Sequence, residues 1–343
     1  MMATLALLIA LALTALAVPD PTDPTPGQAA TASDLGMYET VVAGLRGGGD
    51  YYSLTADALR AGNYPLKPFV TFRLPVHAVV QAALPPLASR LLLMALAIGV
   101  AVAWWRRIAS HLTRASARVA LTVLLAAGLM AFVQADLVAF HEIWAALLLA
   151  LALVLRTSTR WVPSVAIALI AMLVRETAAL LPLVMAAFAW RDGARHEAAG
   201  WSLSLLALFT ALVAHASAVA QVVGPLDPAS PGWSGLLGPG FFVRAVASST
   251  ALDALPTVLA APLVALALFG WTAWRDPLAG RAAMLFAGYA IAIAVFARAD
   301  TFYWALMPAP VLLVGLVFAP DAIRDLAATL LDRRRVRVQR ITQ

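Results

Sequence analysis

The side chains that could do chemistry gather in residues 34–84, the longest polar interval of an otherwise apolar chain. Three glycines, 47–49, break the interval between two helix-like runs, and Pro65 and Pro68 favour an extended segment before the next helix. We therefore expect aqueous chemistry to be concentrated here. Its titratable side chains are the acids Asp34, Glu39, Asp50 and Asp57, the tyrosines Tyr38, Tyr51, Tyr52 and Tyr64, and the cations Arg46, Arg60, Lys67 and Arg73.

A second set of polar side chains interrupts or ends the apolar runs of the chain. Charges held within a bilayer are costly and mark a pathway or a site by default. The alternative is that Arg175 with Glu176, or Arg298 with Asp300, forms only a structural ion pair. Several such groups beside one polar loop favour a functional site. The set comprises Asp136, His141, Glu142, Arg175, Glu176, Arg298, Asp300 and Tyr303.

The elements that must position these residues are membrane helices. Hydrophobic residues make up 62% of the 343 residues and charged residues 12%, and the mean hydropathy is +0.86. This composition is far from that of a soluble domain. The sequence predicts an all-α membrane bundle of about ten transmembrane helices, with interfacial helices in the first outer loop, residues 19–85. The spans are expected at 3–18, 86–105, 119–135, 137–155, 161–174, 177–190, 199–218, 253–273, 282–297 and 304–319.

Two of these runs leave alternatives open. Residues 3–18 have the length of a signal peptide, but no basic residue precedes them, so a retained first membrane helix is favoured. Residues 161–190 are one apolar stretch with Arg175 and Glu176 in its middle. Neither half reaches about 20 residues, which predicts either a tight hairpin below the outer surface or a broken helix.

The distribution of cations orients the bundle, because cytoplasmic loops carry an excess of Lys and Arg. With both termini in the cytoplasm, 16 of the 24 cations fall on the inner side and only 6 of the 18 acids do. The net charge of +6 therefore reflects topology and does not indicate a nucleic-acid partner. Residues 1–320 are expected to form one membrane domain and 321–343 a basic cytoplasmic tail. The tail is a candidate polyanion patch, although contact with anionic lipid headgroups explains it as well.

The phrase SDLGMYETVVAGLRGGGDYY, which follows the first apolar run, resembles the start of the GT-C superfamily. These are polytopic glycosyltransferases that use polyprenyl-phosphate-linked sugars, among them protein O-mannosyltransferases and lipid A aminoarabinose transferases. In that superfamily the first outer loop opens with an acid followed closely by a tyrosine, and an amphipathic helix then ends in G-x-x-Y. Residues 48–52, GGDYY, match that phrase, and YPLKP followed by RLP is similar to the loop section before the second span.

The resemblance implies transfer of a sugar from a polyprenyl-phosphate donor to a glycan, lipid or protein acceptor on the outer face of a bacterial cytoplasmic membrane. Asp34 matches the catalytic acid and would act as general base, with Glu142 or Glu176 as an additional acid. Many members carry a DxD metal motif, which this chain lacks, so no metal or other cofactor is expected. Cysteine is absent, which excludes thiolate sites. The expected substrate-binding residues are Tyr38, Lys67, Arg73, His141, Arg175, Arg298, Asp300 and Tyr303.

Alternatives to this interpretation remain at the level of sequence. A transporter or flippase of a lipid-linked sugar would use the same arginines without needing Asp34 as a base. A scaffold subunit of an envelope-assembly complex would need neither the acids nor the arginines to be buried together. Asp34 itself is expected at the start of a helix with Ser33 as a cap, so a purely local role is the competing hypothesis. Tyr38, four residues later, would share its helical face.

Overall fold

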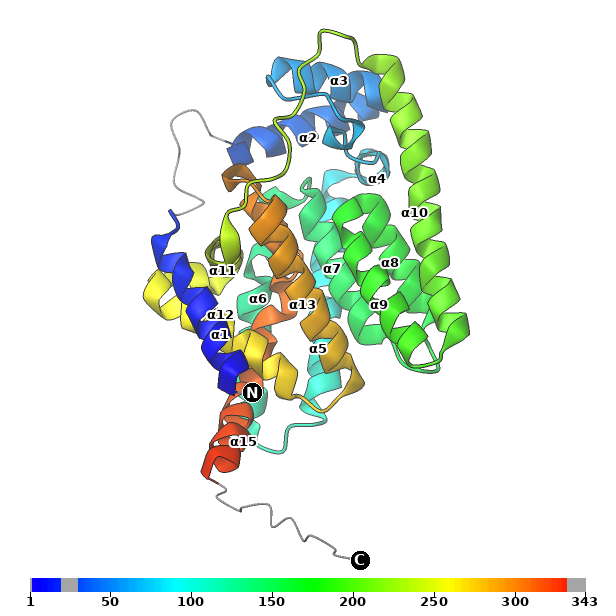
Figure 1. Ribbon diagram of the computed structural model, residues 1–343. Coiled ribbons are helices and arrows are strands. Elements are labelled where there is room, and N and C mark those ends of the chain that lie inside the picture. Colours follow the sequence, from blue (N-terminus) through cyan, green and yellow to red (C-terminus); the bar gives the residue numbers. More distant parts are fainter. Residues whose placement is uncertain (1, 20–29, 332–343) are drawn as a thin grey trace, which may run out of the picture.

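A computed structural model describes residues 2–19 and 30–331, and every regular element within them is a helix (Figure 1). The prediction of an all-α fold is confirmed. The only strand-like pairing among the described residues is an isolated bridge between Lys67 and Ala229. The α-helices are α1 (Met2–Leu13), α2 (Ala30–Arg46), α3 (Tyr51–Ala61), α4 (Val76–Ala83), α5 (Pro86–Ala109), α6 (Ala115–Leu129), α7 (His141–Leu155), α8 (Val162–Val174), α9 (Leu180–Arg191), α10 (Arg195–Val222), α11 (Gly238–Ser248), α12 (Thr257–Ala273), α13 (Pro277–Phe296), α14 (Ala309–Leu312) and α15 (Ala319–Leu331).

Four helices in the described part of the chain are long and apolar enough to cross a membrane. They are Pro86–Ala109, Ala115–Val133, Arg195–Val222 and Pro277–Phe296, and the bent pair Ala299–Leu306 and Ala309–Val317 would make a fifth. Apolar side chains such as Leu203 and Phe209 on α10 point outward with more than half of their surface exposed, as lipid contact requires. The chain is an integral membrane protein. The predicted number of about ten spans is not confirmed, because several apolar helices are only 12–17 residues long.

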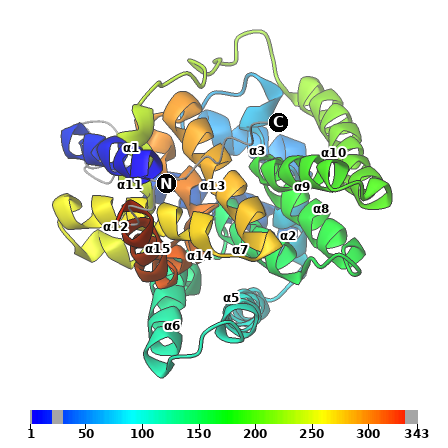
Figure 2. The same ribbon diagram turned by 60° about the horizontal axis from the view of Figure 1, so that its bottom comes forward.

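Helix α7 occupies the middle of the bundle and is buried along nearly its whole length. Viewed from the lower end, α5 and α6 lie on one side, α8, α9 and α10 on another, and α1 and α12 on a third (Figure 2). Close packing of the interior depends on small residues. At Gly270 of α12 an added Cβ would collide with the backbone carbonyl of Gly315, so only glycine permits this approach of two backbones.

Ion pairs tie together the loops at the lower end of Figure 1, where α1 begins and α15 lies. Arg107 in the last turn of α5 pairs with Asp276 before α13, and Arg156 after α7 pairs with Glu197 at the start of α10. Arg281 in α13 pairs with Asp192 after α9. The loops predicted to be cytoplasmic therefore meet at one end of the molecule.

The opposite end is covered by α2 and α3, which lie across the bundle axis in Figure 1. The Tyr51 hydroxyl donates a hydrogen bond to the Arg73 carbonyl at 2.7 Å, and the Tyr52 hydroxyl lies 3.1 Å from His215 Nδ1 on α10. Helix α2 begins at Ala30, so the prediction that Asp34 starts a helix capped by Ser33 is wrong. Asp34 lies in the second turn, where a capping role is excluded.

The interrupted stretch at Arg175 is a hairpin. Arg175 has an extended backbone (φ −148°, ψ 114°) between α8 and a 3₁₀ turn, Glu176–Ala179, and α9 then returns toward the lower end. Of the two alternatives for this stretch, the structure contains the hairpin. At the other boundary, the first residues of the predicted tail belong to α15, which packs on α12, and residues 332–343 lie outside the described residues.

Candidate functional site

A cavity of about 590 Å³ lies under α2 at the upper end of the bundle. Its walls come from α2, the segment after α3, the turn of the α8–α9 hairpin, the loop between α10 and α11, and the end of α13 with the 3₁₀ segment Ala299–Leu306. The structure thus brings together residues that are up to 270 positions apart. The predicted site residues in its wall are Asp34, Tyr38, Arg73, Arg175, Glu176, Arg298, Asp300 and Tyr303.

Asp34 is the most strongly desolvated carboxylate of the first outer loop. Burial raises the pKa of its carboxyl, while a hydrogen bond from the Tyr64 hydroxyl at 2.6 Å and the nearby Arg73 guanidinium work in the opposite direction. A carboxylate with a raised pKa binds a proton more readily than an exposed aspartate does. Asp34 is therefore a suitable acceptor for the proton of a hydroxyl group in this cavity.

Arg175 is held between two carboxylates at the turn of the hairpin. Its Nε donates to Glu142 Oε1 at 2.6 Å, and its Nη1 donates to Glu176. Glu142 is 1% exposed and lies behind the cavity wall, whereas Glu176 lies in the wall itself. Because Glu142 neutralises a buried cation and does not line the cavity, its expected role as an acid in contact with substrate has no support in this geometry.

Arg298 pairs with Asp300 in another part of the cavity wall, with Nη2 2.5 Å from Oδ2. The second carboxylate oxygen of Asp300 and the indole Nε1 of Trp304 are buried and have no hydrogen-bond partner among the described residues. Both residues line the cavity. Leaving such an acceptor and such a donor unpaired costs about 1–3 kcal/mol each, so a ligand with hydroxyl groups would gain by bonding to them if both side chains turned toward the cavity.

Arg73 differs from the other two cavity arginines. Its carbonyl is fixed by Tyr51, but its guanidinium forms no ion pair within 4.0 Å and donates no side-chain hydrogen bond to another described residue. The cations Arg175 and Arg298 are already neutralised by neighbouring carboxylates, whereas Arg73 has its charge available to the cavity. Arg73 is the residue best placed to bind an anionic group.

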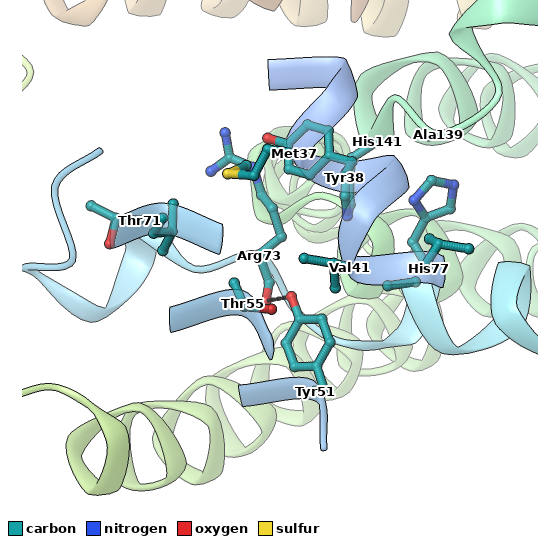
Figure 3. A pocket seen from close by; sticks show the side chains of 13 residues that line it. Met37, Tyr38, Val41, Tyr51, Thr55, Thr71, Arg73, His77, Ala139 and His141 are labelled. Carbon is teal, nitrogen blue, oxygen red and sulfur yellow. Dashed lines mark hydrogen bonds between the residues drawn. The ribbon is translucent and has the colours of Figure 1, made fainter. Parts of the chain in front are cut away.

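His141 lies next to the main cavity but does not line it. It borders a smaller cavity of about 20 Å³ whose wall includes Tyr38, Thr71, Arg73 and His77 (Figure 3). The His141 ring lies 4.7 Å from the ring of Tyr38 and 4.4 Å from that of His77, measured between centroids. The structure therefore separates His141 from the position of a substrate by Tyr38 and Arg73.

Lys67 also lies outside the main cavity. Its ammonium group donates to the Pro225 carbonyl at 2.9 Å, and its backbone pairs with the loop between α10 and α11. Arg60 adds a two-pronged ion pair to Asp227 in the same loop, with distances of 2.9 and 2.8 Å. These contacts hold the loop against the segment after α3, and thereby place Ser230 and Trp233 in the cavity wall.

Several residues of the cavity were not predicted from the sequence. Tyr64, which bonds to Asp34, is one of the titratable residues of the polar interval but not one of the expected binding residues. Trp304 was indistinguishable from an aromatic residue at the membrane interface. Ser230 and Trp233 offered no signal, because they reach the site only when the loop between α10 and α11 folds back onto the first outer loop, as in the hydrogen bond from Ser230 N to the Lys67 carbonyl.

Among the residues that the structure describes, no three His, Asp or Glu side chains are placed to share a metal ion, and metal independence stays a prediction. Comparison of the chain with protein-family models, with curated proteins and with solved structures finds no match. The resemblance to the GT-C superfamily therefore also stays a prediction. The argument for function depends on the geometry of the cavity.

Proposed function

We propose that the protein is a membrane glycosyltransferase of GT-C type, which transfers a sugar from a polyprenyl-phosphate donor to a hydroxyl-bearing acceptor. The observation that carries the proposal is the presence of two complementary groups in one cavity: the desolvated carboxylate of Asp34 and the unpaired guanidinium of Arg73. A base for the acceptor and a cation for the leaving group are the two requirements of such a transfer.

The phosphate of the donor binds to Arg73 in this proposal. A guanidinium can bind two phosphate oxygens at once and gains most when the group is desolvated. Because Arg175 and Arg298 already have carboxylate partners, the cavity offers one uncommitted cation. One cation suits a single phosphate group better than a diphosphate, whose additional charge would need a second cation or a metal ion.

The transfer step then follows directly. Asp34 accepts the proton of the acceptor hydroxyl, and that oxygen forms a bond to the anomeric carbon as the bond from this carbon to the phosphate oxygen breaks. The electron pair of the broken bond stays on the phosphate, where Arg73 stabilises the added negative charge. Attack from the face opposite the phosphate inverts the anomeric configuration.

The sugar itself is held by the polar and aromatic wall between Asp300 and Trp304. In this proposal both side chains turn toward the sugar, where the free oxygen of Asp300 accepts a hydrogen bond from a hydroxyl group and the indole of Trp304 donates one. Trp233 and Tyr303 add aromatic surface, as is typical of ligand sites in which a few polar groups orient the ligand against apolar walls. Glu176 remains available beside Arg175 to orient the acceptor.

The site faces the outside of a bacterial cytoplasmic membrane in this proposal, with both termini in the cytoplasm and the shorter apolar helices completing about ten spans. The meeting of the arginine-rich loops at the lower end supports this orientation. Reporter tags after Gln343 and in the loop 106–118 should be cytoplasmic, and a tag at Gln28 should be external. A cytoplasmic signal at Gln28 would place the site on the cytoplasmic side and contradict the proposed orientation.

The chemical role of Asp34 is tested by Asp34→Asn in a transfer assay with purified protein and a polyprenyl-phosphate sugar. Asparagine has nearly the same shape but cannot accept the proton, so transfer should fall by about a hundredfold or more. The matched control is Asp57→Asn, an acid of the same loop whose side chain is 78% exposed. Equal transfer activity in both variants would remove Asp34 from the mechanism. A protein that moves lipid-linked sugar across the membrane but transfers none would instead be a flippase.

A further inference from the structure

A groove of about 380 Å³ lies on the surface of α9 and α13 and shares no wall residue with the cavity under α2. The two helices pack against each other (Figure 2), and α13 is long and apolar enough to cross a membrane. Leu183 and Met284 in the wall are each 54% exposed, as expected of apolar side chains that face lipid. Apart from Arg191 the wall is apolar, and it consists of Leu183, Val184, Ala187, Phe188 and Arg191 from α9 and Met284 from α13.

The spacing of the wall residues shows how the groove lies in the membrane. Residues 183, 184, 187, 188 and 191 recur at the spacing of one helical face, so the groove follows α9. At 1.5 Å per residue, the stretch from Leu183 to Arg191 covers about 12 Å, slightly less than half of a hydrocarbon core of about 30 Å. Arg191 ends α9 at the lower end of the bundle, beside the 75% exposed Trp190, a residue type typical of the membrane interface. The groove therefore has the depth of one leaflet, with its cation at the level of the headgroups.

The lower end of the groove carries an excess of positive charge. The guanidinium carbon of Arg191 lies 4.3 Å from the centre of the Phe188 ring, and that of Arg281 lies 5.0 Å from the same centre. Asp192 faces both arginines, with Oδ1 3.2 Å from Arg191 and Oδ2 2.7 Å from Arg281. Two cations thus share one carboxylate. The Arg281 side chain is only 3% exposed, whereas that of Arg191 is 68% exposed, so Arg191 is the cation that a ligand can reach.

We propose that this groove binds one anionic phospholipid, with an acyl chain along α9 and the phosphate on Arg191. Basic pockets between membrane helices are suited to anionic headgroups, and a guanidinium can bind two phosphate oxygens at once. The exposed pair with Asp192 holds Arg191 only weakly, since such pairs typically contribute about 0–1 kcal/mol. Chain and headgroup sites follow each other in the order that a lipid requires, from the middle of the bilayer to its surface.

This site is independent of the proposed transfer reaction. The groove lies toward the end of the bundle opposite α2, and its phosphate belongs to a membrane lipid and not to a sugar donor. The lipid contacts both α9 and α13, and a ligand that binds only the folded state stabilises it. The bound phospholipid should therefore raise the thermal stability of the protein without taking part in the chemistry of the upper cavity.

The headgroup contact is tested with Arg191→Gln. Phosphatidylglycerol is titrated into the purified full chain in detergent, and lipid-bound protein is measured by native mass spectrometry. The affinity should fall about tenfold, because a charge-assisted contact with the phosphate is lost. The matched control is Arg275→Gln, an arginine at the same end that is 92% exposed and does not line the groove. It should bind as the wild type does, and zwitterionic phosphatidylcholine should bind more weakly to the wild type than phosphatidylglycerol does.

The chain contact is tested separately with Ala187→Phe, which fills the groove without changing any charge. Its affinity for phosphatidylglycerol should also fall, while Ala207→Phe, at an exposed position of α10 outside the groove, should bind normally. Inorganic phosphate should not displace the lipid, because it gains nothing from the apolar wall. Thermal unfolding of each variant without added lipid shows that it is folded.

Two sets of results would overturn the proposal. Equal affinities of the wild type and Arg191→Gln, or an equal loss in Arg275→Gln, would leave only a general attraction between a basic surface and anionic lipid. Normal binding by Ala187→Phe, or a structure with a second copy of this chain or a polyprenyl chain in the groove, would exclude the acyl chain from it. Loss of binding confined to Arg191→Gln and Ala187→Phe would support the lipid site, even in a protein that transfers no sugar.

Discussion

The two ends of the bundle use the same charged residue types in different ways. At the lower end, Arg107, Arg156 and Arg281 each face a carboxylate at 2.8, 2.6 and 2.7 Å, and each pair joins a helix end to the end or loop of another helix. At the upper end, Arg175 and Arg298 are also paired, but Arg73 is not, and all three border a cavity of about 590 Å³. Among the described residues, the largest of these cavities lies at the upper end, and Arg73 in its wall has no direct carboxylate partner.

This difference shows that an ion pair in a membrane protein is by itself weak evidence for function. The Arg156–Glu197 pair is as buried as many catalytic pairs, yet its hydrogen bonds, including one from Trp201 Nε1 to Glu197 at 3.2 Å, connect helices to each other. Its removal should therefore affect folding. Unsatisfied donors occur at both ends, at Nε of Arg107 and Arg281 as well as at Nε of Arg73, so an unsatisfied polar residue is expected to meet the substrate only if it also borders the large cavity.

The largest effect on transfer is expected from Arg73→Ala. Removal of a donor that stabilises the transition-state charge typically lowers the rate by about 10²–10³-fold. Some stability should be lost as well, because the nearby carboxylates of Glu142 and Glu176 favour the charged form of Arg73 in the folded protein. Transfer rates and thermal unfolding of the same preparations measure both quantities. A fully active Arg73→Ala protein would assign the leaving phosphate to another cation.

The opposite behaviour is expected from Arg156→Ala at the lower end. Loss of one partner leaves Glu197 buried without its counter-charge, which typically costs about 3–5 kcal/mol of stability. Transfer per folded molecule should change little, because neither residue lines the cavity. Denaturant or thermal unfolding in detergent, with transfer normalised to folded protein, checks this. An Arg156→Ala protein that is stable but inactive would contradict the assignment of stability to the lower end and transfer to the upper end.

A smaller effect on transfer is expected from Arg175→Lys, which keeps the positive charge but loses the planar guanidinium with its several N–H donors. A lysine cannot serve Glu142 and Glu176 with the same geometry, so the hairpin turn should shift and transfer should fall by about tenfold. Arg298→Lys, which faces one carboxylate only, is the comparison variant. Full activity in both Arg175→Lys and Arg175→Ala would reduce the Arg175 group to a structural ion pair.

The smallest expected effect is the dependence of transfer and of stability on pH. Because burial raises the pKa of Asp34 above the usual value for an aspartate, transfer should decline as pH falls through that raised pKa and the base becomes protonated. The stability runs the other way: the contribution of Asp34 is fully present below its unfolded pKa and is lost as pH rises through the folded pKa. Asp34→Asn should lack both dependences. Identical pH profiles of unfolding in the two proteins would contradict the desolvated state of Asp34.

Much of the fold follows from the sequence because it depends on local patterns. The apolar runs predict the helices, the arginines predict which loops share an end, and the charges at Arg175 predict the interruption that proves to be a hairpin. The number of spans does not follow in the same way. Apolar runs such as residues 137–155 include 3₁₀ turns and irregular residues, and the regular helix, His141–Leu155, has only 15 residues.

The candidate site was predictable only in part, because sequence shows which residues are polar but not which ones satisfy each other. Asp34, Arg73, Arg175 and Arg298 do line one cavity. Lys67 and Glu142, of the same residue types, are occupied by the Pro225 carbonyl and by Arg175. The distinction between an occupied and an available charge depends on contacts between segments that are distant in sequence, and no spacing pattern encodes it.

The most direct test is a structure of the purified protein with a polyprenyl monophosphate bound. The account predicts that the phosphate lies in the upper cavity, within hydrogen-bond distance of the Arg73 guanidinium and on the side facing Asp34. The same experiment with Arg73→Ala should show no bound phosphate there, while Arg107→Ala at the lower end should bind as the wild type does. A phosphate bound away from Arg73, or at the lower end of the bundle, would contradict the account.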